Sequence, residues 1–199
     1  MSFEILTALL LFAFVSSITP GPNNMMLMAS GANWGLMRSL PHMLGVGIGF
    51  FLMVVVVGIG VMQLFELYPL SYKILQVVSV IYLLYLAYKI SNAKSPEVKD
   101  KGKPITFMQA VLFQWVNPKA WTMAVTSISL YAPDRDFTSI AFVALVFGLV
   151  NFPSISAWAI LGHHIQKWLC TPVRLKVFNW SMAGLLVASL LPSLKAVLV

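Results

Sequence analysis

Residues 19–24 of the chain read Thr-Pro-Gly-Pro-Asn-Asn, and this stretch interrupts an otherwise apolar run. The sequence before it is FEILTALLLFAFVSSI (residues 3–18), and the sequence after it is MMLMASGA (residues 25–32). Proline lacks an amide hydrogen and displaces the carbonyl one turn earlier, so two prolines around a glycine unwind roughly one turn of helix. The stretch therefore predicts a long apolar helix that is broken near its middle.

The composition around this break is that of a membrane protein. The chain has 59% hydrophobic and 10% charged residues, whereas about a quarter of the residues of a soluble domain are charged. Few charges and long apolar runs predict membrane-spanning helices. Apolar spans separate the basic residues behind the net charge of +7, so membrane topology accounts for them better than nucleic-acid binding does. The single cysteine, Cys170, excludes an intramolecular disulfide.

Six spans are expected along the chain, each near the roughly 20 residues that a helix needs to cross a bilayer. The first is expected to be a retained span, because Glu4 stands where a signal peptide would carry basic residues. The expected spans cover residues 4–30, 39–63, 70–90, 106–130, 137–161 and 177–197.

The chain divides into two halves at its one long polar segment. We expect a single transmembrane domain over residues 1–199, with a three-helix repeat at 1–90, a cytoplasmic linker at 91–105 and a second three-helix repeat at 106–199. Because each half has an odd number of spans, the halves would have opposite orientations, as in the inverted repeats of secondary transporters. The expected fold is therefore an all-α integral membrane protein with six transmembrane helices in two inverted repeats. Its first and fourth helices would be broken at proline motifs.

Lysine and arginine are distributed unequally between the two sides of the membrane. The side that carries the linker has nine of them: Arg38, Lys89, Lys94, Lys99, Lys101, Lys103, Lys167, Arg174 and Lys176. The other side has three: Lys73, Arg135 and Lys195. Cytoplasmic loops carry the excess of basic residues, so the linker side is expected to be cytoplasmic and both termini periplasmic.

The break at residues 19–24 offers polar groups inside the membrane. In hydrocarbon, freed carbonyls must be buried in protein or line a wet cavity. The helix restarts near Asn23, and its first amides carry a partial positive charge that attracts a carboxylate. The candidate binding residues here are Thr19, Pro20, Gly21, Pro22, Asn23 and Asn24. The plainer interpretation is a kink with capping residues, although a kink needs only one proline.

The fourth span contains a second polar stretch, FQWVNPKAW, with Pro118 as its helix breaker. Gln114 and Asn117 are three residues apart and so share a helix face. Lys119 is the one charged residue well inside an expected span, where a lysine costs on the order of 3 kcal/mol to insert. We expect its side chain to face the protein interior or water. The alternatives are that it reaches the membrane interface or lies over a neighbouring tryptophan as a cation–π pair.

A third polar position lies in the fifth span. Asn151 and Ser154 share a helix face there, and they could line the same cavity or form an interhelical hydrogen bond. No Asp or Glu lies clearly inside a span, and the chain has no phosphate-binding loop, nucleophile elbow or zinc-protease motif. The sequence therefore predicts a protein that is not an enzyme, with no ATP drive, no cofactor and no metal site.

These residues resemble those of the LysE/RhtB family of bacterial amino-acid exporters. The resemblance is carried by TPGPNN at residues 19–24, by FQWVNPKAW at 113–121 and by the glycine-rich second span after Trp34-Gly35. The chain length, the six expected spans and the basic central loop extend it over the whole chain. It implies a secondary exporter in the bacterial inner membrane, driven by proton antiport. Its substrates would be amino acids such as lysine, arginine, homoserine, threonine, leucine, cysteine or O-acetylserine.

The expected function is alternating-access export of a neutral amino acid, since no membrane acid is present to serve a cationic one. The substrate carboxylate would meet the amides near Asn23 and Asn24, with Lys119 pairing it or supplying a fixed positive field. The α-ammonium would bind carbonyls freed by Pro20 and Pro22. A passive channel for a small solute and a membrane scaffold subunit are the alternatives. The apolar spans also allow a homodimer in the lipid bilayer.

Overall fold

The computed structural model describes residues 3–61, 63, 67–93, 103–169 and 171–189. These residues form helices and no strand, so the all-α class expected from the sequence is confirmed for them. The helices are α1 (Phe3–Ile18), α2 (Pro22–Trp34), α3 (Leu36–Val56) with the π-helical turn η1 (Val57–Val61), α5 (Pro69–Ser91), α6 (Phe107–Gln114), α7 (Pro118–Tyr131), α8 (Phe137–Gln166) and α9 (Pro172–Ala188).

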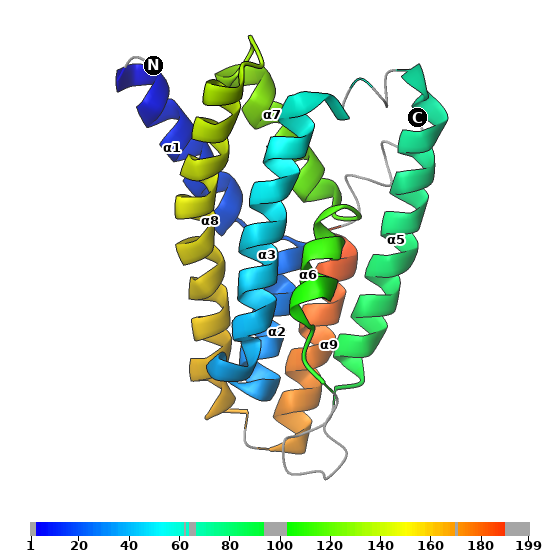
Figure 1. Cartoon of the computed structure of the whole chain (residues 1–199). Helices are drawn as coiled ribbons and strands as arrows, with labels where there is room; N and C mark the ends of the chain where they lie inside the picture. The colour runs from blue at the N-terminus through cyan, green and yellow to red at the C-terminus, as the bar shows by residue number, and fades with distance from the viewer. Residues whose placement is uncertain (1–2, 62, 64–66, 94–102, 170, 190–199) are drawn as a thin grey trace.

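The helices form a bundle in which α3, α5, α8 and α9 run in roughly the same direction, whereas α1 lies oblique to them (Figure 1). α1 and α2 follow one another in the chain and are bent by 54° at their junction. α6 and α7 also follow one another, with a short break between them. α3 and α8 pack beside α2, and α5 packs against α9. Both pairs of consecutive helices, α1 with α2 and α6 with α7, therefore belong to the same bundle.

Several helix starts follow local capping rules. α2, α5, α7 and α9 begin at a proline, whose missing amide leaves no helical bond unmade in the first turn. Thr106 and Gln109 form a capping box at the start of α6: Thr106 Oγ1 accepts from the Gln109 amide at 3.3 Å, and Gln109 Oε1 accepts from the Thr106 amide at 3.1 Å. Asp136 starts α8 by accepting a hydrogen bond from the Ser139 amide at 3.0 Å.

α2 is the most enclosed element, and glycines let it cross α8 at close range. Eleven of its thirteen residues are buried. A Cβ on Gly31 would lie 2.1 Å from the carbonyl oxygen of Ala159, and a Cβ on Gly162 would lie 2.1 Å from the carbonyl oxygen of Met28. The two backbones are in direct contact at both crossings, so neither glycine can carry a side chain without moving a helix.

A second pair of glycines brings α3 against α6. A Cβ on Gly45 would lie 2.4 Å from the carbonyl oxygen of Phe107, and a Cβ on Gly49 would lie 2.8 Å from the Cα of Val111. Small residues at this spacing allow close packing of membrane helices. Because α6 covers this face of α3, a homodimer would have to use another surface.

The outside of the bundle is apolar, as expected for a protein surrounded by lipid. Exposed side chains on its surface include Leu11, Phe14, Ile81, Leu149 and Leu161. Within the part of the chain that the structure describes, three helical segments are long and apolar enough to cross a membrane, namely those over α3 with η1, α5 and α8. The bent pair of α1 and α2 makes a fourth if it counts as one span. The full number of six spans stays a prediction.

The helix boundaries differ from the expected spans by three or more residues in four places. α2 continues to Trp34, beyond the expected end at residue 30, and α3 begins at Leu36, before the expected start at residue 39. α8 continues to Gln166, beyond the expected end at residue 161. α9 begins at Pro172, before the expected start at residue 177, because Thr171 Oγ1 accepts a hydrogen bond from the Arg174 amide at 3.4 Å and caps the helix there. Residues 190–197 of the expected sixth span and 94–102 of the expected linker lie outside the described residues.

Candidate functional site

The first helix break covers residues 19–21, between the end of α1 at Ile18 and the start of α2 at Pro22. In a continuous helix Pro20 and Pro22 would donate to the carbonyls of Ser16 and Ile18, but proline has no amide hydrogen to donate. The end of α1 therefore presents backbone carbonyls that need other donors.

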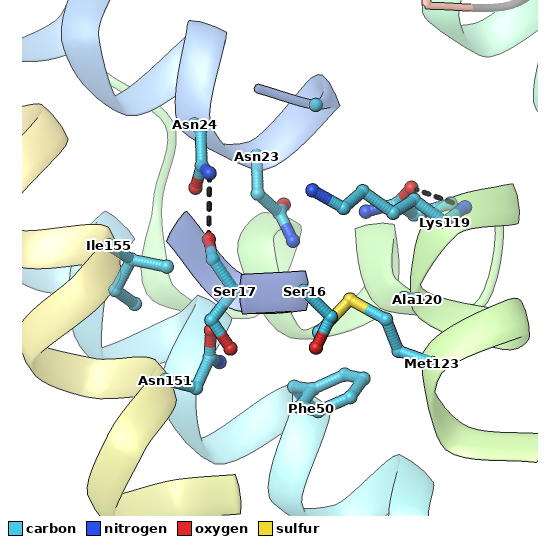
Figure 2. A pocket seen from close by; sticks show the side chains of 12 residues that line it. Ser16, Ser17, Asn23, Asn24, Phe50, Lys119, Ala120, Met123, Asn151 and Ile155 are labelled. Carbon is cyan, nitrogen blue, oxygen red and sulfur yellow. Dashed lines mark hydrogen bonds between the residues drawn. The ribbon is translucent and has the colours of Figure 1, made fainter. Parts of the chain in front are cut away.

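Side chains from neighbouring helices supply donors to these carbonyls. Asn24 Nδ2, in α2, donates to the carbonyl oxygens of Ser17 and Thr19, both at 2.8 Å (Figure 2 shows the first). Trp158 Nε1, in α8, donates to the carbonyl oxygen of Ile18 at 3.0 Å. The unwound backbone is thus hydrogen-bonded inside the protein, as an apolar environment requires.

Lys119, in the first turn of α7, also binds the first break. Its Nζ lies 2.6 Å from the carbonyl oxygen of Thr19, 2.9 Å from Thr19 Oγ1 and 3.5 Å from the carbonyl oxygen of Pro20. Its aliphatic stem passes over Gly21, where a Cβ would lie 2.6 Å from Lys119 Cδ. The ammonium is therefore held at the C-terminal end of α1, where the helix dipole is negative.

The second break covers residues 115–117, between the end of α6 at Gln114 and the start of α7 at Pro118. Asn117 caps α7, because its Oδ1 accepts a hydrogen bond from the Lys119 amide at 3.1 Å. The helix thus ends before Pro118, and the proline occupies the first turn of the next helix.

The two breaks are joined by a reciprocal amide pair. Asn23 Nδ2 donates to Gln114 Oε1 at 2.8 Å, and Gln114 Nε2 donates to Asn23 Oδ1 at 3.3 Å. Gln114 is fully buried and also donates to the carbonyl oxygen of Ala110 at 2.9 Å. Polar residues of the first and second breaks therefore form one connected network.

A small cavity lies between the two breaks (Figure 2). It has about 20 Å³ of space for water centres, which is roughly enough for one water molecule. Six of the sequence-predicted residues line it: Gly21, Asn23, Asn24, Asn117, Lys119 and Asn151. The remaining predicted residues stand around it, since Thr19 and Pro20 bind Lys119, Gln114 binds Asn23, and Pro22 and Pro118 begin the two restarted helices.

Six further lining residues lie outside the sequence-predicted set: Ser16, Ser17, Phe50, Ala120, Met123 and Ile155. The hydroxyl oxygen of Ser17 is buried and has no hydrogen-bond partner among the described residues. The Asn151 side chain, 5% exposed, also forms no hydrogen bond within the described part of the chain. Buried polar groups are normally paired, so both groups are available to a ligand. The one sequence signal for Ser17 is its place, beside Ser16, directly before the break.

The chemistry of the wall suits a small polar solute. Its polar groups are amides, hydroxyls and the ammonium of Lys119. None of its lining residues carries a carboxylate. Across the described residues, no three His, Cys, Asp or Glu side chains converge in a way that could hold a metal ion. The cavity therefore offers hydrogen-bonding groups and a positive charge, and no Asp or Glu is among its lining residues.

Comparison with known proteins places the chain among membrane translocators. The family model described as "LysE type translocator" matches residues 14–190. A cysteine/O-acetylserine efflux protein of Klebsiella pneumoniae is 27% identical over 189 residues, which cover 94% of this chain and 95% of that protein. A cysteine/O-acetylserine efflux protein of Escherichia coli K12 is 27% identical over 170 residues, which cover 84% of this chain and 87% of that protein. No solved structure matches the chain.

Proposed function

Because the chain belongs to the LysE type translocator family, we propose that it exports a neutral amino acid across the bacterial inner membrane. Proteins of this family are transporters, so the chain is a membrane transport protein and not an enzyme. The relatives described above are named for efflux of cysteine and O-acetylserine. A small neutral amino acid of that type suits a wall without a carboxylate, and homoserine, threonine and leucine are further members of the same class.

The observation that carries this proposal is the meeting of two helix junctions, residues 19–21 and 115–117, at one polar cavity. Broken helices expose amides and carbonyls in the membrane, and these groups bind the charged ends of small solutes. We assign the substrate carboxylate to the first-turn amides of α2, at Asn23 and Asn24. We assign the α-ammonium to the carbonyl oxygens at the end of α1. Asn151, Gln114 and Asn117 would surround the bound molecule.

The cavity has to widen before an amino acid can enter. Its present space of about 20 Å³ holds roughly one water molecule. Two contacts beside it, the pair of Asn23 with Gln114 and that of Lys119 with Thr19, join the first break to the second. In alternating access these contacts would rearrange so that the cavity opens to one side at a time. Proton antiport is the proposed drive.

The topology that we propose has six spans in two inverted three-helix repeats, residues 1–90 and 106–199, joined by a cytoplasmic linker at 91–105. The broken spans would be α1 with α2 and α6 with α7. Both termini would be periplasmic, because the basic residues gather on the linker side.

Cysteine labelling tests this orientation in cells. After Cys170→Ser, a cysteine is placed at Asp134, in the exposed loop between α7 and α8, or at Asn92, exposed at the end of α5. We expect a membrane-impermeant maleimide to label the Asp134→Cys protein in cells whose outer membrane has been permeabilised and whose inner membrane is intact. The Asn92→Cys protein should react only after the inner membrane is opened. The reverse pattern would show that the protein has the opposite orientation. Labelling of both cysteines from the same side would show that the segment between Asn92 and Asp134 does not cross the membrane.

Counterflow tests the transport proposal. Purified protein is reconstituted into liposomes loaded with one unlabelled amino acid, and uptake of the same labelled amino acid is followed. Transient accumulation with a neutral amino acid would establish a carrier and identify its substrate. Equilibration without an overshoot would favour a passive channel. No flux by folded protein for any amino acid would favour the scaffold subunit.

Removing the two unpaired polar groups of the wall should weaken substrate binding. A hydrogen bond contributes about 1–1.5 kcal/mol, so we expect Ser17→Ala and Asn151→Ala each to raise the half-saturation concentration in counterflow by roughly five- to tenfold. The control is Ser181→Ala, because Ser181 is exposed on α9 and bonds only the carbonyl oxygen of Val177 within its own helix. If both wall variants stay within twofold of the unmodified protein, the cavity is not the binding site.

A further inference from the structure

We propose that the Lys119 ammonium occupies the subsite for the substrate α-ammonium in the empty carrier, so that substrate entry must displace it. This inference rests on the proposed function, and it names the group that competes with the substrate at that site.

The oxygens around Lys119 are those that an α-ammonium needs. Nζ lies 2.6 Å and 2.9 Å from the carbonyl and hydroxyl oxygens of Thr19, and 3.5 Å from the carbonyl oxygen of Pro20. A lysine ammonium has three N–H donors and no acceptor, and an α-ammonium has the same three donors. The negative end of the α1 dipole favours a cation at this position. One set of oxygens can therefore serve either cation.

The other carbonyls at this break are held by uncharged donors. Asn24 binds the carbonyl oxygen of Ser17 and shares that of Thr19 with Lys119, and Trp158 binds that of Ile18. These amide and indole donors belong to α2 and α8 and bring no charge. Among the described residues, the oxygens of Thr19 and Pro20 are thus the part of the break that a cation occupies. A substrate ammonium that binds this break meets Lys119 there.

The side chain of Lys119 lies directly over Gly21. The φ of Gly21, −171°, is extended and open to any residue, so its backbone conformation does not require glycine. A Cβ there would lie 2.6 Å from Lys119 Cδ and 3.1 Å from Nζ, so a side chain at this position would displace the flexible end of the lysine and leave the backbone in place. The lysine also forms part of the cavity wall. Moving it away would both free the oxygens and enlarge the cavity, and the displaced ammonium could then turn to the substrate carboxylate.

The consequence is a competition that can be measured with half-substrates. Ethanolamine is serine without its carboxylate, and 3-hydroxypropionate is serine without its ammonium. If Lys119 holds the ammonium subsite nine-tenths of the time, removing it should tighten ethanolamine binding about tenfold. Binding is measured as thermal stabilisation of the purified full-length protein over a concentration series. This readout does not depend on transport.

The test compares Lys119→Met with the unmodified protein, and Lys89→Met is the matched control, because Lys89 is an exposed lysine at the end of α5. We expect a tenfold lower dissociation constant for ethanolamine in Lys119→Met and no gain for 3-hydroxypropionate. Lys89→Met should change neither. Ethanolamine binding that is unchanged or weaker in Lys119→Met would overturn the inference. Absence of counterflow by the unmodified protein would instead overturn the proposed function.

A chemical variant keeps the test decisive if Lys119→Met does not accumulate. In a Cys170→Ser background, the thiol of Lys119→Cys is alkylated by 2-bromoethylamine, which restores a lysine-like ammonium, or by 2-bromoethanol, which adds a neutral group of similar size. We expect the aminoethyl protein to bind ethanolamine about tenfold more weakly than the hydroxyethyl protein, for the same reason of competition. Equal binding by the two products would overturn the inference.

Discussion

Gly162→Ala is expected to prevent normal packing of α2 against α8. The new Cβ would lie 2.1 Å from the carbonyl oxygen of Met28, and the next two atoms that it meets are also backbone atoms of Met28. A backbone oxygen cannot rotate away as a flexible side chain can, so the helices have to separate. Overpacking costs about 1–3 kcal/mol, and we expect the upper end of that range or more for this substitution. Gly31→Ala should act in the same way through Ala159.

The measurement is the yield of monodisperse protein in detergent together with its melting temperature. The matched control is Gly184→Ala in α9, because a Cβ at Gly184 meets no atom within 4 Å. This control should be neutral or stabilising by up to about 1 kcal/mol, since alanine is the better helix former. Equal yield and melting temperature for Gly162→Ala and Gly184→Ala would show that α2 and α8 do not cross as closely as the structure describes.

The helix starts beside both motifs follow from local chemistry, which is why the sequence indicates them. Pro22 and Pro118 each begin a helix, because a proline in the first turn leaves no helical bond unmade. Asn117 adds a side-chain cap, so the second break lies just before the proline. Such effects need only neighbouring residues. The pairing of these helices into broken membrane spans depends on the bilayer and stays a prediction.

The wall of the cavity depends on which helix faces meet, and the sequence does not show this. α1 is apolar on nearly every side, yet Leu9, Ala13 and Ser17 are buried while Phe14 is exposed. No periodicity distinguishes the inward face, so Ser17 has no signal beyond its place next to the break. The partner of Lys119 is likewise hidden, because Thr19 lies one hundred residues away in sequence. Contacts of this kind are set by tertiary packing.

Asn24→Asp is expected to abolish transport while changing very few atoms. The substitution replaces Nδ2 by an oxygen at a position 2.8 Å from the carbonyl oxygens of both Ser17 and Thr19. Asn24 is 3% exposed, so an ionised carboxylate there would be buried against two acceptors, and a protonated one could donate to only one of them. Burying an unpaired charge costs several kcal/mol. The new carboxylate would also repel the two carbonyl oxygens at the end of α1 that the amide of Asn24 binds. We expect the initial counterflow rate per folded protein to fall by about a hundredfold or more.

The matched control is Asn92→Asp, because Asn92 Nδ2 donates to the carbonyl oxygen of Tyr88 at the same distance of 2.8 Å, but in an exposed position. Exposed substitutions usually change stability by less than about 0.5 kcal/mol, so this variant should transport at the unmodified rate. Both variants lose an amide donor, but only Asn24 is buried at the break. A difference in rate between them therefore reports the effect of that buried position. If Asn24→Asp is folded and keeps more than half of the unmodified rate, the geometry at the end of α1 is not needed for transport. The substrate would then have to bind elsewhere in the bundle.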